Sequence, residues 1–295
     1  MWIGPGADRT RRMAVRSKAP SVRPSPRPFL KWAGGKGELL PEILRRLPNG
    51  PIDCYVEPFV GGGAVFFALV RAGRIRRAIL GDRNVELVDT YRAVQTLPEA
   101  VLAQARSWAG TEETYYAVRS MAVETLTPAE RAARVLYLNR NGFNGLYRLN
   151  GSGVFNVPFG RYANPPQIDG DNLLRASEAL QGVELVNGDF ETVLEAASSG
   201  AVVYLDPPYW PMSETSKFNA YDGTTFGAAD QTRLATVFRG LPTRGLTGLL
   251  SNSDVPATRA LYAGLDLDAV LCTRRINSKG EGRGQVSELL VRSGA

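Results

Sequence analysis

The chain has 295 residues, 44% of them hydrophobic, so it can bury a large core as one domain or as a domain carrying an insertion. It contains no histidine, which excludes a histidine metal ligand and a histidine general base. Its two cysteines, Cys54 and Cys272, show no metal-ligand spacing. No apolar run approaches the roughly 20 residues of a membrane span, and the N-terminus lacks an apolar secretory leader. We therefore expect a cytoplasmic protein that binds neither a metal nor a membrane.

The net charge of +6 is concentrated in residues 1–28. Seven lysines and arginines stand there against Asp8 alone, which leaves the rest of the chain with equal numbers of basic and acidic side chains. The segment is also rich in proline and poor in apolar residues, so we expect a disordered basic tail. Either the tail helps to hold an anionic polymer, or the true start is Met13.

From Phe29 onward, short apolar runs alternate with helical patterns, which is typical of an α/β sheet. Seven runs predict strands, at residues 52–59, 76–82, 183–189, 202–208, 246–253, 267–275 and 287–293. Four of the first five end in or next to an acidic residue or Asn252. Ligands of open parallel sheets bind beyond the carboxyl ends of the strands. We therefore expect these polar ends to share one crevice.

Between residues 84 and 169 this alternation stops. Three helical patterns occupy the first part, at residues 84–106, 112–124 and 128–140. A Gly- and Asn-rich stretch, 141–162, follows and predicts a loop with a β-hairpin. Residues 131–168 contain five arginines and no acidic residue, a one-signed pattern that favours binding of a polyanion. We interpret 84–169 as a mostly helical domain inserted into a sheet domain made of 29–83 and 170–295.

The segment "VEPFVGGGAVFFALV" (56–70) predicts a strand, a glycine-rich bend and the start of an apolar helix. Glycines allow a ligand to approach the backbone, and the helix N-terminus offers N–H groups to it. A glycine-rich turn is also common for packing reasons alone. We expect cofactor contacts at Glu57, Phe59, Gly61 and Gly63.

Asp82 follows the next strand at the distance typical of a ribose-binding carboxylate. Both the phosphate-loop lysine pattern and the full dinucleotide glycine pattern are missing, so a nucleoside cofactor without phosphates fits better than a nucleotide. In "FLKWAGGKGELL", Lys36 can hold a carboxylate and Trp32 can cover a ring. After the third strand, Asp189 can accept from an exocyclic amine and Phe190 can stack beside it. Singly these residues also fit a cap over the core or an ordinary strand end; together they describe S-adenosylmethionine.

The stretch "LDPPYW" (205–210) ends an apolar strand with one carboxylate, two prolines and two aromatic rings. Consecutive prolines remove two backbone donors and fix the chain direction just past Asp206. The ordinary interpretation is a strand followed by a proline turn, with Tyr209 and Trp210 in the core. The alternative is a rigid corner that holds a flat polar molecule, and the residues alone favour neither.

Four stretches in one order, "FLKWAGGK", "EPFVGGGAVFF", "NGFNGLYRLNGSGVFNVPFGRY" and "DPPY", resemble the Dam-type DNA adenine-N6 methyltransferases. The resemblance covers residues 29–295 and excludes the tail. It implies a Rossmann-like, S-adenosylmethionine-dependent methyltransferase sheet with an inserted, mostly helical DNA-recognition domain ending in a β-hairpin. It also implies double-stranded DNA as partner, and we expect a monomer in solution.

The resemblance assigns roles to the candidate residues. Trp32 and Lys36 are expected to contact the cofactor, and Asp82 its ribose hydroxyls. The cofactor's adenine is expected near Asp189 and Phe190.

The resemblance also explains "DPPY". Asp206 is expected between the cofactor and the target adenine, whose amino group is a poor nucleophile. The Asp206 carboxylate and the Pro207 carbonyl would accept its N–H bonds and leave its lone pair facing the methyl group, while Tyr209 stacks on the flipped base.

The same resemblance predicts DNA contacts. Arg148 is expected to read a guanine, because arginine can donate two bonds to its O6 and N7 atoms. Leu146 is expected to wedge into the base stack and Asn144 to support the displaced strand. The other expected contacts are Lys31 on the outer guanine, Pro158 on a thymine methyl group, and Tyr162.

Jointly these residues suggest the target GATC, and several alternatives stay open. Relatives that recognise longer palindromes in restriction–modification systems share parts of the hairpin. A silent DNA-binding regulator is disfavoured because Lys36, Asp82, Asp206 and Tyr209 are intact. An RNA substrate is disfavoured by the hairpin, and a protein glutamine substrate by Asp206, where that motif begins with Asn.

Overall fold

The computed structural model describes residue 1 and residues 25–211, 226–273 and 285–294. Most of the predicted tail therefore lies outside the described residues. Arg27, which the sequence assigns to the tail, is docked on the fold. Its backbone N–H donates to Asn172 Oδ1 at 3.0 Å, and its carbonyl accepts from Asn172 Nδ2 at 3.0 Å.

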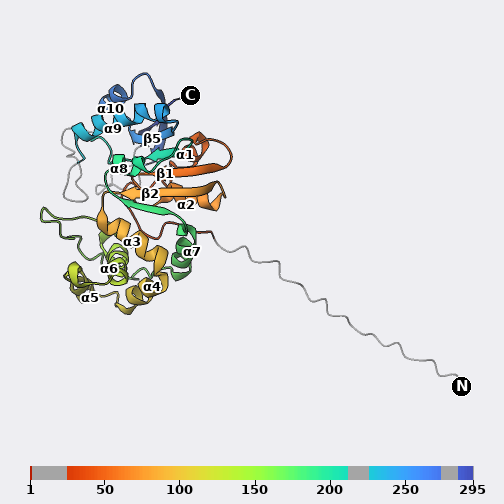
Figure 1. Cartoon of the computed structure of the whole chain (residues 1–295). Helices are drawn as coiled ribbons and strands as arrows, with labels where there is room; N and C mark the ends of the chain where they lie inside the picture. The colour runs from red at the N-terminus through yellow and green to blue at the C-terminus, as the bar shows by residue number, and fades with distance from the viewer. Residues whose placement is uncertain (2–24, 212–225, 274–284, 295) are drawn as a thin grey trace.

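Within the described residues, seven strands form one sheet in the order β3-β2-β1-β4-β5-β7-β6 (Figure 1). Their bounds are β1 Ile52–Glu57, β2 Ile75–Asp82, β3 Glu184–Asn187, β4 Val202–Leu205, β5 Thr247–Ser253, β6 Asp266–Thr273 and β7 Gln285–Arg292. The first five strands are parallel, and β7 pairs antiparallel with β5 and β6. All seven predicted strands are confirmed. The fourth ends at Leu205, before the prediction, because Pro207 and Pro208 cannot donate ladder hydrogen bonds.

Helices cover both faces of the sheet. The α-helices of the described part are α1 Leu40–Arg46, α2 Ala64–Arg71, α3 Val85–Thr96, α4 Pro98–Ser107, α5 Glu112–Arg119, α6 Pro128–Asn141, α7 Gly170–Leu180, α8 Phe190–Glu195, α9 Ala228–Gly240 and α10 Pro256–Leu261. Short 3-10 helices lie at Val123–Thr125, Phe143–Gly145 and Pro242–Arg244. In the view of Figure 1, α9 and α10 lie above the strands, and α3 to α7 lie below them.

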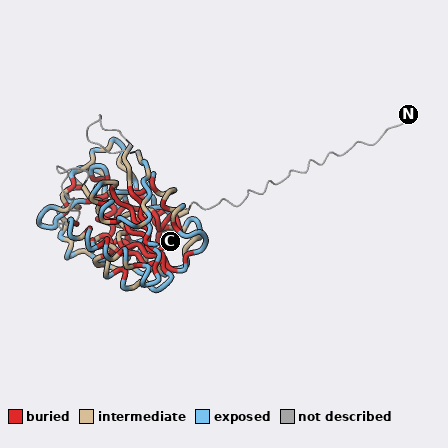
Figure 2. The backbone as a smooth tube through the Cα atoms, turned by 90° about the horizontal axis from the view of Figure 1, so that it is seen from above, coloured by how far each residue is buried: buried red, intermediate tan, exposed pale blue. Residues whose placement is uncertain are grey.

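Strand side chains alternate between two cores, as the period of two requires. On β4, Tyr204 packs into one core while Val203 and Leu205 pack into the other. The first core includes residues of α1, α2, α3, α4, α6 and α7, and the second includes residues of α8 and α9. Figure 2 shows this buried material running through the middle of the molecule.

The predicted long helix 84–106 is two helices, α3 and α4. The break falls at Leu97 (φ −135°, ψ 40°), because the proline ring of Pro98 disfavours helical geometry at the preceding residue. The first core continues from the sheet into both helices: Leu80 of β2 shares it with Tyr91 of α3 and Val101 of α4. The proposed division into two domains at residues 84 and 169 stays a prediction.

Residues 141–162 form an antiparallel loop. Two isolated β-bridges, Gly142–Phe159 and Leu149–Phe155, hold its arms together. A small third core of Tyr115, Val118, Tyr137, Leu138, Tyr147, Phe155 and Val157 packs this loop against α5 and α6. The predicted hairpin is therefore present as two bridged arms, and neither arm forms an extended strand.

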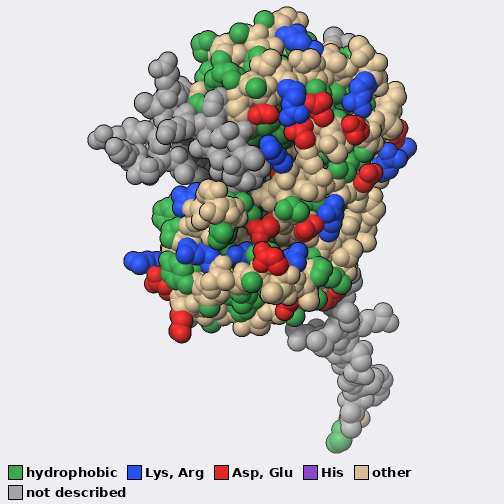
Figure 3. Space-filling model, turned by 60° about the vertical axis from the view of Figure 1, so that its left-hand side comes forward, with side chains coloured by type: hydrophobic (Ala, Val, Ile, Leu, Met, Phe, Trp, Pro, Cys, Tyr) green, Lys and Arg blue, Asp and Glu red, His purple; other side chains and the backbone are tan. Residues whose placement is uncertain are grey.

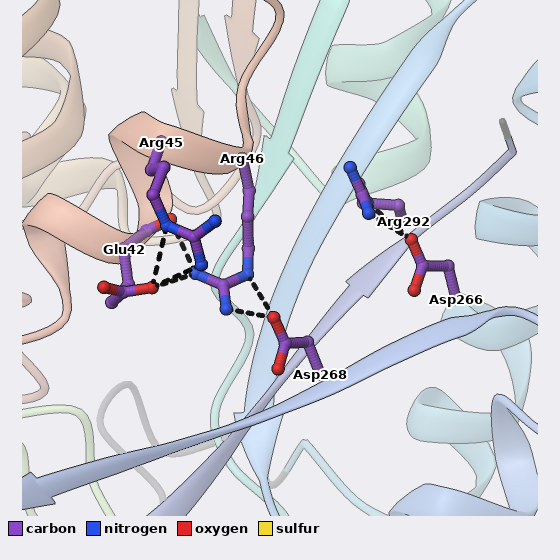
Figure 4. A network of polar contacts seen from close by, with 6 residues as sticks. All are labelled: Glu42, Arg45, Arg46, Asp266, Asp268 and Arg292. Carbon is purple, nitrogen blue, oxygen red and sulfur yellow. Dashed lines mark hydrogen bonds and ion pairs between the residues drawn. The ribbon is translucent and has the colours of Figure 1, made fainter.

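A polar network fastens α1 to the edge of the sheet (Figure 4). The Arg46 guanidinium, 7% exposed, donates from Nε to Asp268 Oδ2 of β6 at 2.9 Å and also pairs with Glu42. Next to it, Arg292 of β7 donates from Nε to Asp266 Oδ2 at 2.7 Å. The carboxylates are partly or half exposed, so we expect these pairs to fix geometry more than to add stability.

Gly81 tests how tightly β2 packs on α8. A Cβ atom at this position would lie 2.3 Å from Val193 Cγ2 and 3.1 Å from the Val186 carbonyl oxygen. We expect Gly81→Ala to lower the free energy of unfolding in urea by about 1–3 kcal/mol. Gly240→Ala is the control, because nothing lies within 4 Å of its Cβ; it should change stability by less than about 1 kcal/mol. Equal stability of the two variants would contradict the packing described here.

Candidate active site

The five parallel strands end at one edge of the sheet, and polar residues stand at or just after each end. They are Glu57 on β1, Asp82 on β2, Asn187 on β3, Asp206 directly after β4 and Ser253 on β5. Neighbouring registers align these ends, since Asp82 is the partner of Asn187 and Leu205 that of Leu250. The polar strand ends therefore lie along one edge of the sheet, and the expectation that they share one crevice stays a prediction.

An ion pair joins the segment before α1 to the end of β4. Lys36 Nζ lies 2.8 Å from Asp206 Oδ2, donates to the Gly34 carbonyl at 2.7 Å, and lies 4.7 Å from the centre of the Tyr209 ring. The Lys36 side chain is only 7% exposed and that of Asp206 20%. Two sequence motifs far apart in the chain thus meet in a partly buried contact.

The second oxygen of Asp206 is held from β5. Ser251 Oγ donates to Asp206 Oδ1 at 2.8 Å. Ser251 is fully buried, and its Oγ lies 2.9 Å from the Tyr204 hydroxyl. Both carboxylate oxygens therefore have a donor, and the orientation of the Asp206 side chain is fixed.

Buried side chains also fix the backbone after Asp206. Gln231 Nε2 of α9 donates to the Pro208 carbonyl at 2.7 Å. Asn252 accepts from the Trp210 N–H at 3.0 Å and donates to Gln231 Oε1 at 3.0 Å. Ser253 Oγ donates to the Trp210 carbonyl at 2.7 Å. These contacts supply partners for backbone groups that a proline corner cannot pair within a sheet.

The Tyr209 ring is fixed at its far end as well. Its hydroxyl donates to Glu288 Oε2 of β7 at 2.8 Å. Burial and the neighbouring carboxylate of Asp206 raise the pKa of Tyr209 well above its usual value, so the phenol stays neutral and donates. The ring is half-buried and lies beside Lys36, so it is not a fully buried core side chain; its contact with a flat ligand stays a prediction.

Sequence analysis missed the supporting residues Gln231, Ser251 and Glu288. One signal was available: "SNS" (251–253) is a run of three polar residues in an otherwise apolar strand, and all three are buried. Such residues persist only with hydrogen-bond partners. The sequence around Gln231 contains no comparable pattern that would have predicted its role.

Glu57 is buried beneath the edge of the sheet. It is 2% exposed and accepts from the Tyr55 hydroxyl at 2.9 Å. The pKa of Glu57 is raised to about 8, mainly by burial and also by the Asp206 carboxylate. The hydrogen bond from Tyr55 acts in the opposite direction and lowers this pKa. We therefore expect a protonated Glu57 at neutral pH.

The glycine-rich bend packs on Trp32. A Cβ on Gly61 (φ +48°) would lie 2.7 Å from Trp32 Cδ1, and a Cβ on Gly63 (φ +70°) would lie 2.8 Å from the Tyr91 hydroxyl. The Gly61 N–H donates to Asp82 Oδ2 at 3.2 Å. Packing alone therefore accounts for Gly61 and Gly63. Their contact with a cofactor, like that of Trp32 and Asp82, stays a prediction.

Asp189 and Phe190 begin α8 and already have protein partners. Asp189 accepts from the Glu191 N–H at 3.2 Å and from Arg233 at 2.8 Å. The Phe190 ring is 2% exposed, stacks on Phe59 at 5.7 Å, and has the Arg233 guanidinium 4.5 Å from its centre. Phe59 is the more exposed of the two stacked rings. The predicted adenine contacts at this corner remain predictions.

The predicted DNA contacts gather on the 141–162 loop and on the segment before α1. Lys31, Asn144, Arg148 and Pro158 are exposed, whereas Leu146 is partly buried against the third core. Tyr162, also partly buried, donates to the Gly142 carbonyl at 3.1 Å. The six residues expected to contact DNA thus divide into four exposed side chains and two that are partly packed.

Two features of this loop are unusual for an ordinary surface loop. Asn144 has a positive φ of 56°, a strained conformation for a residue other than glycine. Phe143 beside it is 50% exposed, and sequence analysis had not singled it out. Figure 3 shows basic and acidic side chains interspersed on one face of the molecule. The distribution of charge on this face therefore does not identify a binding site for DNA.

Comparison with known proteins decides the family. Residues 32–276 match the family described as D12 class N6 adenine-specific DNA methyltransferase. The chain belongs to this family. It is therefore an adenine-specific DNA methyltransferase, and the family depends on S-adenosylmethionine. The resemblance on which the sequence interpretation rested is confirmed.

Relatives within this methyltransferase family span nearly the whole chain. The DNA adenine methylase of Escherichia coli (strain K12) is 40% identical over 271 residues, covering 90% of this chain and 94% of the relative. Type II methyltransferase M1.LlaDCHI of Lactococcus lactis subsp. cremoris is 38% identical, with the same coverage of both chains. Type II methyltransferase M.MjaIII of Methanocaldococcus jannaschii is 39% identical, covering 90% of this chain and 98% of the relative.

Among the helices of the methyltransferase that the structure describes, none is long and apolar enough to cross a membrane.

The buried carboxyl group of this methyltransferase leads to a pH prediction. Between about pH 4.5 and 8, folded Glu57 keeps a proton that the unfolded chain has released, so stability falls as pH rises. Glutamine cannot ionise, so we expect Glu57→Gln to remove this decrease in the free energy of unfolding, which amounts to about 2–5 kcal/mol.

The measurement is the free energy of unfolding in urea for the wild type and the variant at about pH 5 and about pH 8. Parallel pH slopes for the two proteins would show that Glu57 ionises normally in the folded state.

Proposed function

We propose that this protein transfers a methyl group from S-adenosylmethionine to N6 of adenine in duplex DNA, at the sequence GATC, after flipping the adenine into a pocket formed by residues 206–209. The observation that carries the proposal is the fixed carboxylate of Asp206, held by Lys36 on one oxygen and by Ser251 on the other. An acceptor held in one orientation can align a weak nucleophile with an electrophile.

The residues at the edge of the sheet fit the cofactor. Lys36 donates to the Gly34 carbonyl and forms an ion pair with Asp206, and its ammonium group could also pair with the methionine carboxylate. Asp82, at the end of β2, would accept from the ribose hydroxyls, with Trp32 and the bend Gly61–Gly63 beside it. When bound, the cofactor supplies an activated methyl group on a sulfonium sulfur.

The residues after β4 act on the adenine. Asp206 and the Pro207 carbonyl would accept the two N6–H bonds, so the nitrogen becomes tetrahedral and its lone pair faces the methyl group. The methyl group would pass from the sulfonium sulfur to N6, leaving a neutral thioether, and the proton that N6 loses would pass to the Asp206 carboxylate that accepts its N–H bond. Tyr209, held by Glu288, would stack on the flipped base.

The exposed residues of the 141–162 loop support the GATC assignment. Arg148 donates from Nε to Asn156 Oδ1 at 2.7 Å, which orients its guanidinium on the loop surface. Lys31 is exposed beside the loop and Pro158 lies on it. Phe143 and Leu146 offer apolar side chains for the gap left by a flipped base. A role in replication or repair fits GATC.

A longer palindrome within a restriction–modification system is the second candidate. It is favoured because two of the relatives described above are named type II methyltransferases. The chemistry at Asp206 would be the same, and only the bases read by the loop would differ. A silent DNA-binding regulator is the third candidate, and the intact ion pair between Lys36 and Asp206 weighs against it.

A transfer assay tests the proposal. The protein is incubated with methyl-labelled S-adenosylmethionine and one of three duplexes, which contain GATC, GATC with its adenine already N6-methylated, or GTAC. We expect label in the first duplex alone, and none in any duplex with Asp206→Ala. Asp268→Ala is the matched control, because it also removes a carboxylate from a cation that is 7% exposed, but away from the site; it should remain active.

The other outcomes separate the candidates. Label in both the GATC and the GTAC duplexes would keep the chemistry and overturn the GATC assignment. No label in any duplex, with S-adenosylmethionine still bound, would favour the longer palindrome or the silent regulator. Full activity of the Asp206→Ala variant would overturn the catalytic role of the carboxylate.

Arg148 should carry base discrimination. We expect Arg148→Ala to lower the preference for GATC over AATC, measured as a ratio of kcat/KM values, by about 10- to 100-fold, because a bidentate contact to guanine is lost. Arg161→Ala is the control. Arg161 is an exposed arginine of the same loop that pairs with Glu112 at 3.5 Å, and its loss should affect both duplexes alike. An unchanged ratio for Arg148→Ala would assign guanine recognition elsewhere.

A further inference from the structure

The ring of Tyr147, in the loop expected to read DNA, lies against the ring of Trp32, in the segment expected to contact the cofactor. The two ring centres are 5.1 Å apart and the planes differ by 28°, a stacked arrangement. Tyr147 is 4% exposed. Neither the cofactor contacts nor the DNA contacts described above include it.

Tyr147 is fixed on its other sides. Its hydroxyl donates to a carboxylate oxygen of Glu86 on α3, and the other oxygen of Glu86 pairs with Arg134 of α6 at 3.4 Å. Phe155, on the opposite arm of the loop, meets the Tyr147 ring edge-on at 5.6 Å. A ring held in this way cannot move without moving the loop that carries it.

Trp32 is fixed on the cofactor side. The Gly61 position allows no Cβ, because Trp32 Cδ1 would lie 2.7 Å from it, and Gly61 donates to Asp82. The Trp32 ring therefore contacts both the glycine-rich bend and Tyr147. A displacement of either partner changes the space available to the other.

Asn139 makes a second connection between the same two segments. Its Oδ1 accepts from the Lys31 N–H at 2.8 Å, and its Nδ2 donates to the Lys31 carbonyl at 2.7 Å and to the Gly145 carbonyl at 2.9 Å. Asn139 is 2% exposed. One buried side chain on α6 thus holds the backbone next to Trp32 and the backbone two residues before Tyr147.

We propose that Tyr147 is a positioning residue that couples cofactor binding to DNA binding through its stack on Trp32. The inference rests on the proposed function, since it takes Trp32 to contact the cofactor and the 141–162 loop to contact DNA. Ordering of Trp32 by the cofactor holds the loop in place for DNA, and ordering of the loop by DNA holds Trp32 in place for the cofactor. Such coupling is reciprocal, so each ligand must raise the affinity for the other by the same factor.

The test is a binding cycle with S-adenosylhomocysteine, which cannot react, and the duplex that the wild-type protein methylates. The dissociation constant of S-adenosylhomocysteine is measured by calorimetry without DNA and with saturating DNA. The ratio of these two constants is the coupling factor. We expect a factor of about 5 or more for the wild type. Tyr147→Phe keeps the ring and should keep the factor, whereas Tyr147→Leu should bring it close to 1 while each ligand still binds alone.

Phe155→Leu is the matched control. It removes a buried ring from the same core, next to Tyr147, but among the described rings Trp32 stacks on Tyr147 and not on Phe155. Its coupling factor should stay near that of the wild type, and thermal unfolding checks that all variants fold.

The outcomes distinguish the two levels of inference. A wild-type factor of 1, a Tyr147→Leu factor equal to the wild type, or an equal loss in Phe155→Leu would overturn the coupling role and leave the proposed function intact. A wild-type protein that binds neither ligand would overturn the proposed function and the coupling with it.

Discussion

The ion pair between Lys36 and Asp206 is the constraint on which the site depends. A lysine that is 7% exposed must have a partner, because a buried unpaired charge costs several kcal/mol. Its partner sits where β4 ends and the prolines turn the chain. The segment before α1 must therefore close over the carboxyl end of the sheet for the charge to be neutralised. That closure places Trp32 on the glycine-rich bend and Lys31 beside the 141–162 loop.

Buried polar side chains extend this constraint into the sheet. The end of the internal strand β5 buries three polar side chains, Ser251, Asn252 and Ser253, where apolar residues would be expected. Such an arrangement is stable only when every polar group has a hydrogen-bond partner. They find those partners in the backbone and side chains of residues 206–210 and in Gln231. The stability of β5 and the geometry of the candidate site thus rest on the same hydrogen bonds.

Local patterns predicted most of the fold because local rules decide it. Short apolar runs located all seven strands, and Pro98 explains why one predicted helix is two. The polar strand ends were predictable because parallel strands end at one edge. The contacts of Glu288 with Tyr209 and of Asn139 with Lys31 were not, because they join residues far apart in the chain and no spacing rule connects them.

Two buried asparagines show why the 141–162 loop and the sheet are not independent. Asn172 of α7 pairs with the peptide groups of Arg27, and Asn139 of α6 pairs with those of Lys31, so the segment between them is held at both ends. Phe29 and Leu30 in this segment are buried in the first core. The chain that leads to Lys36 is therefore anchored first on α7, which follows the predicted insertion, and then on α6, which lies within it. A shift of α6 relative to the sheet would therefore also move this segment, which leads to Lys36 and its partner Asp206.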